Sequence, residues 1–208
     1  MNLPPRRGSV AAGHGERSDA VESRHRILAA ARELFEKKGV DRVSMHEIGR
    51  RAGVGQGTLY RHFEHKGVLC SELLREKVEE FREEAGSGTE GEEALLGISW
   101  LLDRLALFNE ENAPLLGAMR DASGGGRRME MYKSSFYRWL RATVSALLLR
   151  GVEGGEIRPD LDADCVADFL LAALNVDLYL FQRRELGMDR ARIAGALRLC
   201  LDGFRADG

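Results

Sequence analysis

Two short helical patterns separated by a glycine place the strongest constraint on what this chain folds into. In the segment SMHEIGRRAGVGQGTLYRHF (44–63), residues 45–52 and 56–63 each have helical apolar spacing, and Gly53 lies between them. The apolar residues spaced to pack the two helices together are Ile48, Ala52, Val54 and Leu59. Two such helices joined by a tight glycine-containing turn are typical of a helix-turn-helix, whose second helix enters the major groove of DNA.

The second of these helices directs polar side chains outwards, because Leu59 and Phe63 are four residues apart and share its inward face. Gln and Arg side chains hydrogen-bond to base edges, whereas Thr and Tyr hydroxyls suit phosphate oxygens. The outward residues, which we expect to contact DNA, are Gln56, Gly57, Thr58, Tyr60, Arg61 and His62. Lys66 starts the next helix and adds a cation where a phosphate can dock. The alternative is a three-helix packing unit with a basic surface.

The remainder of the chain has helical periodicity and no strand-like alternation of useful length, so we predict an all-α fold. Residues 1–18 contain many turn-forming residues, and we expect a flexible basic arm there. Asp19 and Glu22 have the spacing of a helix-capping box. The expected helices are 19–38, 45–52, 56–63, one from about 66, 92–111, 114–121, 128–150, 162–185 and 189–206. This pattern predicts a DNA-binding domain at 19–66 and a helical body at 67–208.

The charges are distributed unevenly along the chain. Residues 1–70 contain 13 Lys and Arg against 8 Asp and Glu, whereas residues 71–208 contain 18 against 25. A basic N-terminal domain on an acidic body is typical of a DNA-binding protein. No apolar stretch approaches the length of a membrane span, and the N-terminus lacks the apolar region of a secretory signal. We therefore expect a cytoplasmic protein with no membrane partner.

The cysteines and the missing motifs argue against an enzyme or a metalloprotein. Cys70, Cys165 and Cys200 are far apart and lie in helical patterns, which favours buried free thiols in a reducing compartment. Redox sensing by Cys165 or Cys200 is the alternative. The chain has no GxSxG, P-loop, HExxH or CxxC motif, so we expect no catalytic residue, cofactor or metal site. An architectural DNA-binding protein is a further alternative, against which the long acidic body argues.

The segment 162–185 is apolar almost all round, apart from a stripe at Asp168, Asn175 and Gln182. A helix of this kind is buried on both sides, so one side can pack on its own body and the other on a second subunit. The alternative is a core helix of a monomer. The apolar pattern by itself therefore favours a contact between this helix and a second subunit.

A mostly apolar pocket for a small-molecule effector is expected among the large side chains of the middle helices. Asp177 lies on the apolar side of its helix, where a carboxylate needs a partner. That partner is either an arginine such as Arg104 or Arg138, or a ligand in the pocket. The candidate ligand-binding residues are Trp100, Met119, Phe136, Trp139 and Asp177.

Residues 24–70 resemble the DNA-binding domain of the tetracycline-repressor (TetR) family of bacterial regulators. The matching elements are Ile27-Leu28-Ala29-Ala30-Ala31, Leu34-Phe35, Gly39, Ile48, Ala52-Gly53-Val54, Gly57-Thr58-Leu59-Tyr60-Arg61-His62-Phe63 and Lys66. The resemblance implies about nine helices, in which an N-terminal three-helix domain precedes a ligand-binding and dimerising body. Gly55 departs from the family's frequent Ser or Thr cap, and Gly67 from a frequent acidic residue.

The family's site residues transfer to matching positions of this sequence. The resemblance implies phosphate contacts for Thr58, Tyr60 and Lys66 and a backbone contact for Ser44. It places Gln56, Gly57 and Arg61 where base edges are read. It further implies a homodimer formed through the last two helices. This dimer would be a repressor that binds a palindromic operator and leaves it when a small molecule binds the body. Activation or co-repression by the ligand stays open. Half-sites about 34–36 Å apart would match two such domains.

Overall fold

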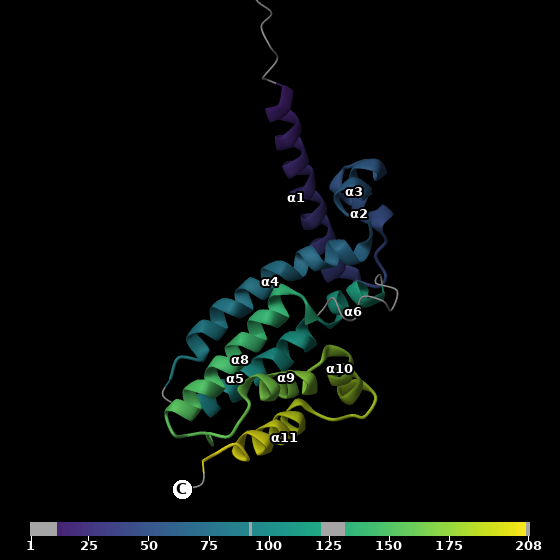
Figure 1. The fold of residues 1–208 in the computed structure, drawn as a ribbon. Coiled ribbons are helices and arrows are strands. Elements are labelled where there is room, and N and C mark those ends of the chain that lie inside the picture. Colours follow the sequence, from purple (N-terminus) through teal and green to yellow (C-terminus); the bar gives the residue numbers. More distant parts are fainter. Residues whose placement is uncertain (1–11, 92, 122–131, 207–208) are drawn as a thin grey trace, which may run out of the picture. The chain divides into compact units, whose positions relative to one another are not determined.

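The computed structural model describes residues 12–91, 93–121 and 132–206 and is helical throughout that part, as predicted. Its only β pairing there is an isolated bridge between Ile157 and Arg205. The helices, labelled in Figure 1, are α1 (Ala12–Lys38), α2 (Met45–Ala52), α3 (Gln56–His62), α4 (Lys66–Gly88), α5 (Ala94–Glu111), α6 (Ala113–Asp121), α8 (Ser135–Glu153), α9 (Ala163–Ala173), α10 (Val176–Arg184) and α11 (Arg190–Asp202). Among the described residues, no helix combines the length and apolar character that crossing a bilayer requires.

The chain forms two compact units, one up to Leu69 and the other from Cys70 onwards. In the N-terminal unit, α1 packs against α2 and α3. The side chains that fill the space between these helices are completely buried, and they include Ile27, Ala31, Ile48, Leu59 and Phe63. Their spacing of three, four or seven residues along a helix places them on one face, which explains why three short amphipathic segments share a core.

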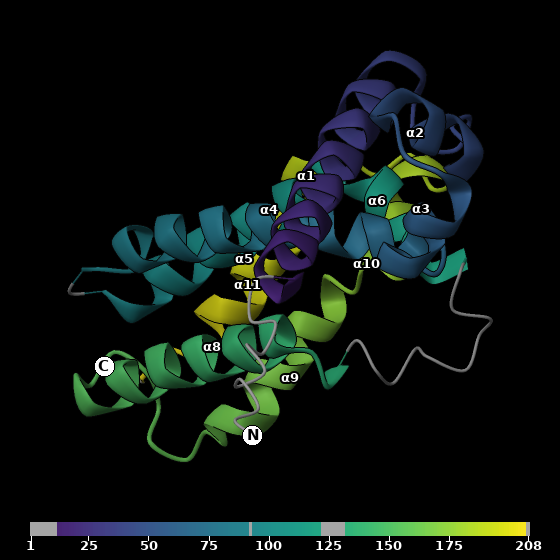
Figure 2. The ribbon, with the colours of Figure 1, turned by 90° about the horizontal axis from the view of Figure 1, so that it is seen from above.

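In the C-terminal unit, α5 contacts α6, α8, α10 and α11, and α8 lies beside α9 (Figure 2). Two glycines allow unusually close packing in this unit. A methyl group at Gly88 would lie 2.3 Å from the Trp100 indole, and one at Gly151 would lie 2.5 Å from Ile157. The ends of α4 and α8 therefore approach their neighbours more closely than any side chain at these positions would permit.

Helix boundaries differ from the predictions at three places. First, α1 begins at Ala12, so Asp19 is not its N-cap. No proline lies between Ala12 and Asp19, and the helix includes these residues. Second, α8 is Ser135–Glu153 and extends beyond the expected end at residue 150. The expected start of that helix at 128 falls in 122–131, which lies outside the described residues, as do residues 1–11 of the expected arm.

The third difference is the expected single helix 162–185, which is two helices. Leu174 ends α9, and Asn175 caps α10 by accepting a hydrogen bond from the Asp177 backbone N–H at 3.1 Å. The buried side chain of Asn109 in α5 donates to the Leu174 carbonyl at 2.9 Å, which satisfies one carbonyl at the end of α9. Local polar capping causes the break between α9 and α10. The apolar spacing of the sequence continues across it and therefore did not reveal it.

Candidate nucleic-acid interface

Ser44 and Gly53 determine where α2 begins and ends. The Ser44 hydroxyl accepts a hydrogen bond from the Glu47 N–H at 3.2 Å, which satisfies one of the unpaired donors at the helix start. Gly53 adopts a left-handed conformation with φ +65°, and its N–H donates to the Arg50 carbonyl. Because this φ strains any residue with a Cβ, glycine suits the turn that redirects the chain into α3.

The helices α2 and α3 approach each other closely at Gly49, a position that our sequence analysis missed. A methyl group there would lie 3.2 Å from Leu59 Cδ2 and 2.8 Å from Gln56 Nε2. Gly49 is buried and its carbonyl accepts from the Val54 N–H at 3.0 Å. The available signal in the sequence was that Gly49 follows Ile48, a predicted packing residue. The sequence alone does not tell which small residue of α2 lies where α2 and α3 cross.

The outward face of α3 presents Gly57, Tyr60 and Arg61 to solvent. Tyr60 has 49% of its surface exposed, unusual for so large a ring, and Arg61 is also exposed. No atom lies within 4 Å of where a Cβ at Gly57 would be. Thr58 is partly buried in the first turn of the helix. This surface offers hydroxyl and guanidinium donors around an open stretch of backbone, a combination that suits DNA.

Two of the predicted contact residues are engaged within the N-terminal unit. The Gln56 amide lies against the backbone of Gly49 rather than extending from α3. The Lys66 ammonium donates to the Val40 carbonyl and lies 5.8 Å from the centre of the Phe35 ring. Both side chains therefore stabilise the unit when DNA is absent, whatever contacts they make when it is present.

His62 is partly buried at the end of α3. Burial lowers its pKa, and the positive charges of Arg61 and Arg24 lower it further. The ring is therefore neutral at neutral pH, since the ordinary histidine pKa already lies below that value. Within the described residues, its buried Nε2 has no hydrogen-bond partner. His62 thus contributes no charge at this face.

Four of the five candidate ligand residues are partly buried against the core of the C-terminal unit, and Asp177 is held in an ion pair. Trp100 packs on Gly88, and Phe136 and Trp139 stack with centroids 6.1 Å apart. Met119 is partly buried in α6. Asp177 forms an ion pair with Arg120 at 2.7 Å. A salt bridge was one of the two expected roles, but its partner is neither Arg104 nor Arg138, because α10 packs against α6.

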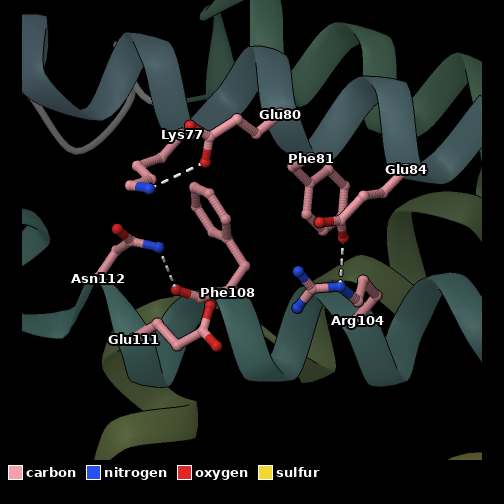
Figure 3. A pocket seen from close by; sticks show the side chains of 8 residues that line it. All are labelled: Lys77, Glu80, Phe81, Glu84, Arg104, Phe108, Glu111 and Asn112. Carbon is pink, nitrogen blue, oxygen red and sulfur yellow. Dashed lines mark hydrogen bonds and ion pairs between the residues drawn. The ribbon is translucent and has the colours of Figure 1, made fainter.

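A pocket of about 350 Å³ lies between α4 and α5 (Figure 3), and none of those five candidates lines it. Its lining residues are Lys77, Glu80, Phe81, Glu84, Arg104, Phe108, Glu111 and Asn112. The signal in the sequence was two stripes of charged and aromatic residues at three- or four-residue spacing. The sequence analysis missed the pocket because the spacing of residues along one helix does not tell which other helix that stripe faces.

Large apolar side chains of the last helices are exposed in the single chain. Phe169 of α9 has 61% of its surface exposed, Phe181 of α10 has 50% and Leu199 of α11 has 74%. None of the three cysteines, all of which are described, forms a disulfide. Only Cys70 is buried, so the expectation of buried thiols is wrong for Cys165 and Cys200 in this chain. Cys165 and Cys200 both lie on outward faces of their helices. The apolar spacing of the sequence did not distinguish these exposed positions from buried ones.

Comparisons with known proteins agree with the geometry. Residues 27–73 match the family model described as bacterial regulatory proteins, tetR family. An HTH-type transcriptional regulator of Staphylococcus aureus (strain bovine RF122 / ET3-1) is 30% identical over 169 residues, covering 80% of this chain and 85% of the relative. Such relatives are transcriptional regulators, a class distinct from enzymes.

Solved structures share the fold at lower identity. A TetR transcriptional regulator from Chloroflexus aurantiacus has a TM-score of 0.64 at 24% identity, over 91% of this chain and 100% of that one. The SmeT–triclosan complex has a TM-score of 0.60 at 23% identity, over 89% and 93%. From the matched residues, the helix-turn-helix and the shared fold, we conclude that the chain belongs to the TetR family of bacterial regulatory proteins and is a DNA-binding transcriptional regulator.

Proposed function

We propose that this regulator is a repressor that binds a palindromic operator as a homodimer in the cytoplasm and leaves it when a small molecule binds the C-terminal unit. The observation on which the proposal rests is the outward face of α3, where Tyr60 and Arg61 are exposed beside the open backbone of Gly57. An exposed aromatic ring and a cation on one helical face suit contact with phosphates and bases.

The proposed roles follow the chemistry of each side chain. Tyr60, Thr58 and Ser44 donate hydroxyl hydrogen bonds to phosphate oxygens, and Lys66 adds a cation at the start of α4. Arg61 reads guanine or contacts a phosphate, and Gln56 reads adenine after leaving Gly49. Gly57 allows close approach of the backbone to DNA, and neutral His62 offers hydrogen bonds without charge.

The exposed apolar residues of α9, α10 and α11 support the proposed dimer. Large apolar side chains exposed on a single chain mark interaction sites where they form a patch. A two-fold symmetric contact through these helices would present α3 twice, and successive major grooves lie about 34–36 Å apart. A palindromic operator then binds both copies with the same contacts.

The pocket between α4 and α5 supports an effector site, because its volume falls at the small end of the range for ligand pockets. One fold neighbour, SmeT, was solved as a complex with triclosan. Since α4 both borders the pocket and begins at Lys66, next to the DNA-binding helices, we propose that a ligand shifts the spacing of the two α3 helices. The ligand changes the equilibrium between the two spacings by no more than the difference between its binding free energies for the two states.

The test is selection of a binding sequence from random DNA, followed by fluorescence anisotropy with the selected duplex. The Tyr60→Phe variant, which loses only the hydroxyl, is expected to bind about three- to tenfold more weakly, as one lost hydrogen bond implies. Tyr132→Phe, a matched change in the C-terminal unit, is expected to bind like the wild type. Failure to enrich any sequence would refute operator binding.

A further inference from the structure

The pocket between α4 and α5 has features that specify the chemistry of a ligand. Its volume of about 350 Å³ accommodates a compact molecule rather than a long acyl chain. Figure 3 shows residues of α4 facing residues of α5 across this space. Phe81 and Phe108 contribute apolar lining, with their rings edge to face and centroids 5.3 Å apart. One part of the ligand should therefore be an apolar ring.

The charges that line the pocket are unbalanced. Lys77 pairs with Glu80 at 2.9 Å, and Arg104 pairs with Glu84 at 2.6 Å. The remaining charged lining residue, Glu111, is exposed and forms no ion pair within the described residues. With both cations already paired, the surplus charge is one carboxylate, which favours a positively charged group in the pocket.

Asn112 provides an acceptor beside that carboxylate. The residue is only 6% exposed, and its amide nitrogen donates to the Phe108 carbonyl at 2.9 Å. That bond fixes the amide, so its side-chain oxygen is left to accept from another donor. No hydrogen bond to this oxygen is found in the described part of the chain. An acceptor in a pocket that also has an unpaired carboxylate suits an N–H donor that is also a cation.

Arg104 is the group that an anionic ligand would need, but it is unsuited to one. Its Nε donates to Glu84, which raises the pKa of the guanidinium and keeps the pair ionised. Its Nη1 is buried and has no partner within the described residues. An anion approaching this guanidinium would meet the negative charge of Glu84, and Glu111 is also near enough to interact with Arg104.

We infer that the effector is a small protonated amine with an aromatic ring, whose ammonium lies against the Glu111 carboxylate and whose ring lies against Phe108. This inference rests on the proposed function, because it names the class of ligand for the proposed effector site. Glu111 is the last residue of α5 and Asn112 is its C-cap, so these consecutive side chains leave the chain in different directions and Glu111 alone is assigned to the ammonium.

The test compares three probes of similar shape by isothermal titration calorimetry on the full chain. Phenethylamine is cationic at neutral pH, phenethyl alcohol is neutral and hydrocinnamate is anionic. Each is titrated into the wild type, Glu111→Gln and Glu83→Gln. Glu83 is an exposed glutamate of α4 that does not line the pocket, so its substitution changes the net charge equally.

Phenethylamine is expected to bind the wild type at least about tenfold more tightly than the alcohol or the anion, which corresponds to about 1.4 kcal/mol. Glu111→Gln is expected to lose about tenfold in affinity for the amine, and Glu83→Gln to retain it. Equal or tighter binding of the alcohol or the anion would overturn the inference. So would an amine affinity that Glu111→Gln leaves unchanged, or no detectable binding of the amine.

The proposed function is tested separately with an operator-release assay. If phenethylamine fails to bind but another class of compound releases the operator DNA, the ligand class is wrong and the regulated repressor stands. If the amine binds at Glu111 and no compound affects DNA binding, the ligand chemistry stands and ligand-released repression fails.

Discussion

At the scale of single residues, a substitution at Gly57 is expected to have opposite effects on folding stability and on DNA binding. It lies in α3, and the space around its missing side chain is open, so alanine fits there without contact. Alanine favours the helical conformation by up to about 1 kcal/mol over glycine. We therefore expect Gly57→Ala to raise the thermal stability of the protein.

The same variant is expected to bind the operator more weakly, because a methyl group would separate the α3 backbone from DNA. An overpacked contact costs about 1 to 3 kcal/mol. Anisotropy with the selected operator measures this loss. Gly86→Ala in α4, where a methyl group is equally free of contacts, is the control and should stabilise without weakening DNA binding. Unchanged operator affinity for Gly57→Ala would contradict a close backbone approach.

At the scale of elements, α5 holds α10 through a polar cluster. The hydroxyl of fully buried Tyr179 donates to Glu110 Oε1 at 2.7 Å. Arg183 donates to the same carboxylate, and its Nη1 donates to the Met188 carbonyl at 2.6 Å. Burial and the hydrogen bond to Glu110 raise the pKa of Tyr179 to about 12. The cluster therefore ties the two ends of α10 to one turn of α5.

The pH dependence of stability should report on this cluster. Burial acts to raise the pKa of Glu110, but the hydrogen bonds from Arg183 and Tyr179 outweigh it, and the net pKa is below the ordinary 4.5. A carboxyl group whose pKa is lowered by folding stabilises the fold at any pH above its pKa in the unfolded chain. This stabilisation is lost as the pH falls through its pKa in the folded chain. At pH 7, Glu110→Gln is expected to unfold about 1 to 2 kcal/mol more easily.

Urea denaturation at pH 7 and below about pH 4 measures the effect. The difference between the wild type and Glu110→Gln should narrow as the pH falls, because the wild-type carboxylate becomes protonated. The Glu83→Gln control should differ little from the wild type at either pH. A difference that is independent of pH would exclude the ionised Glu110 as its cause.

At the scale of the whole molecule, the exposed apolar side chains of α9, α10 and α11 bear on assembly. Phe181 is half exposed in α10, so Phe181→Glu leaves the packing of the single chain intact. In the proposed dimer the same change buries an unpaired carboxylate. Sedimentation equilibrium is expected to find a monomer, and anisotropy an operator affinity lower by at least about tenfold, since two linked contacts become one.

Leu96→Glu, an equally exposed apolar residue of α5, is the control for this experiment. It should sediment like the wild type and bind the operator normally. A Phe181→Glu protein that remains dimeric would place the interface elsewhere. A wild-type protein that is monomeric at the concentrations used for DNA binding would refute the dimer itself.

The sequence by itself determined the all-helical fold and the helix-turn-helix, because both depend on local properties. The spacing of Ile48, Leu59 and Phe63 selects one face of each short helix, and Gly53 suits the turn between them. All three side chains are completely buried, and α2 spans the predicted residues 45–52 and ends at the Gly53 turn. Short-range patterns were sufficient here, since the interacting residues are close along the chain.

Tertiary structure alone decided which distant residues meet. It placed Arg120 beside Asp177, Asn109 beneath the break between α9 and α10, and Lys66 on the Val40 carbonyl. It also brought the charged stripes of α4 and α5 together to form the pocket. The physical reason is that periodicity states which side of a helix is apolar, whereas the partner of that side depends on how all the helices fill space together.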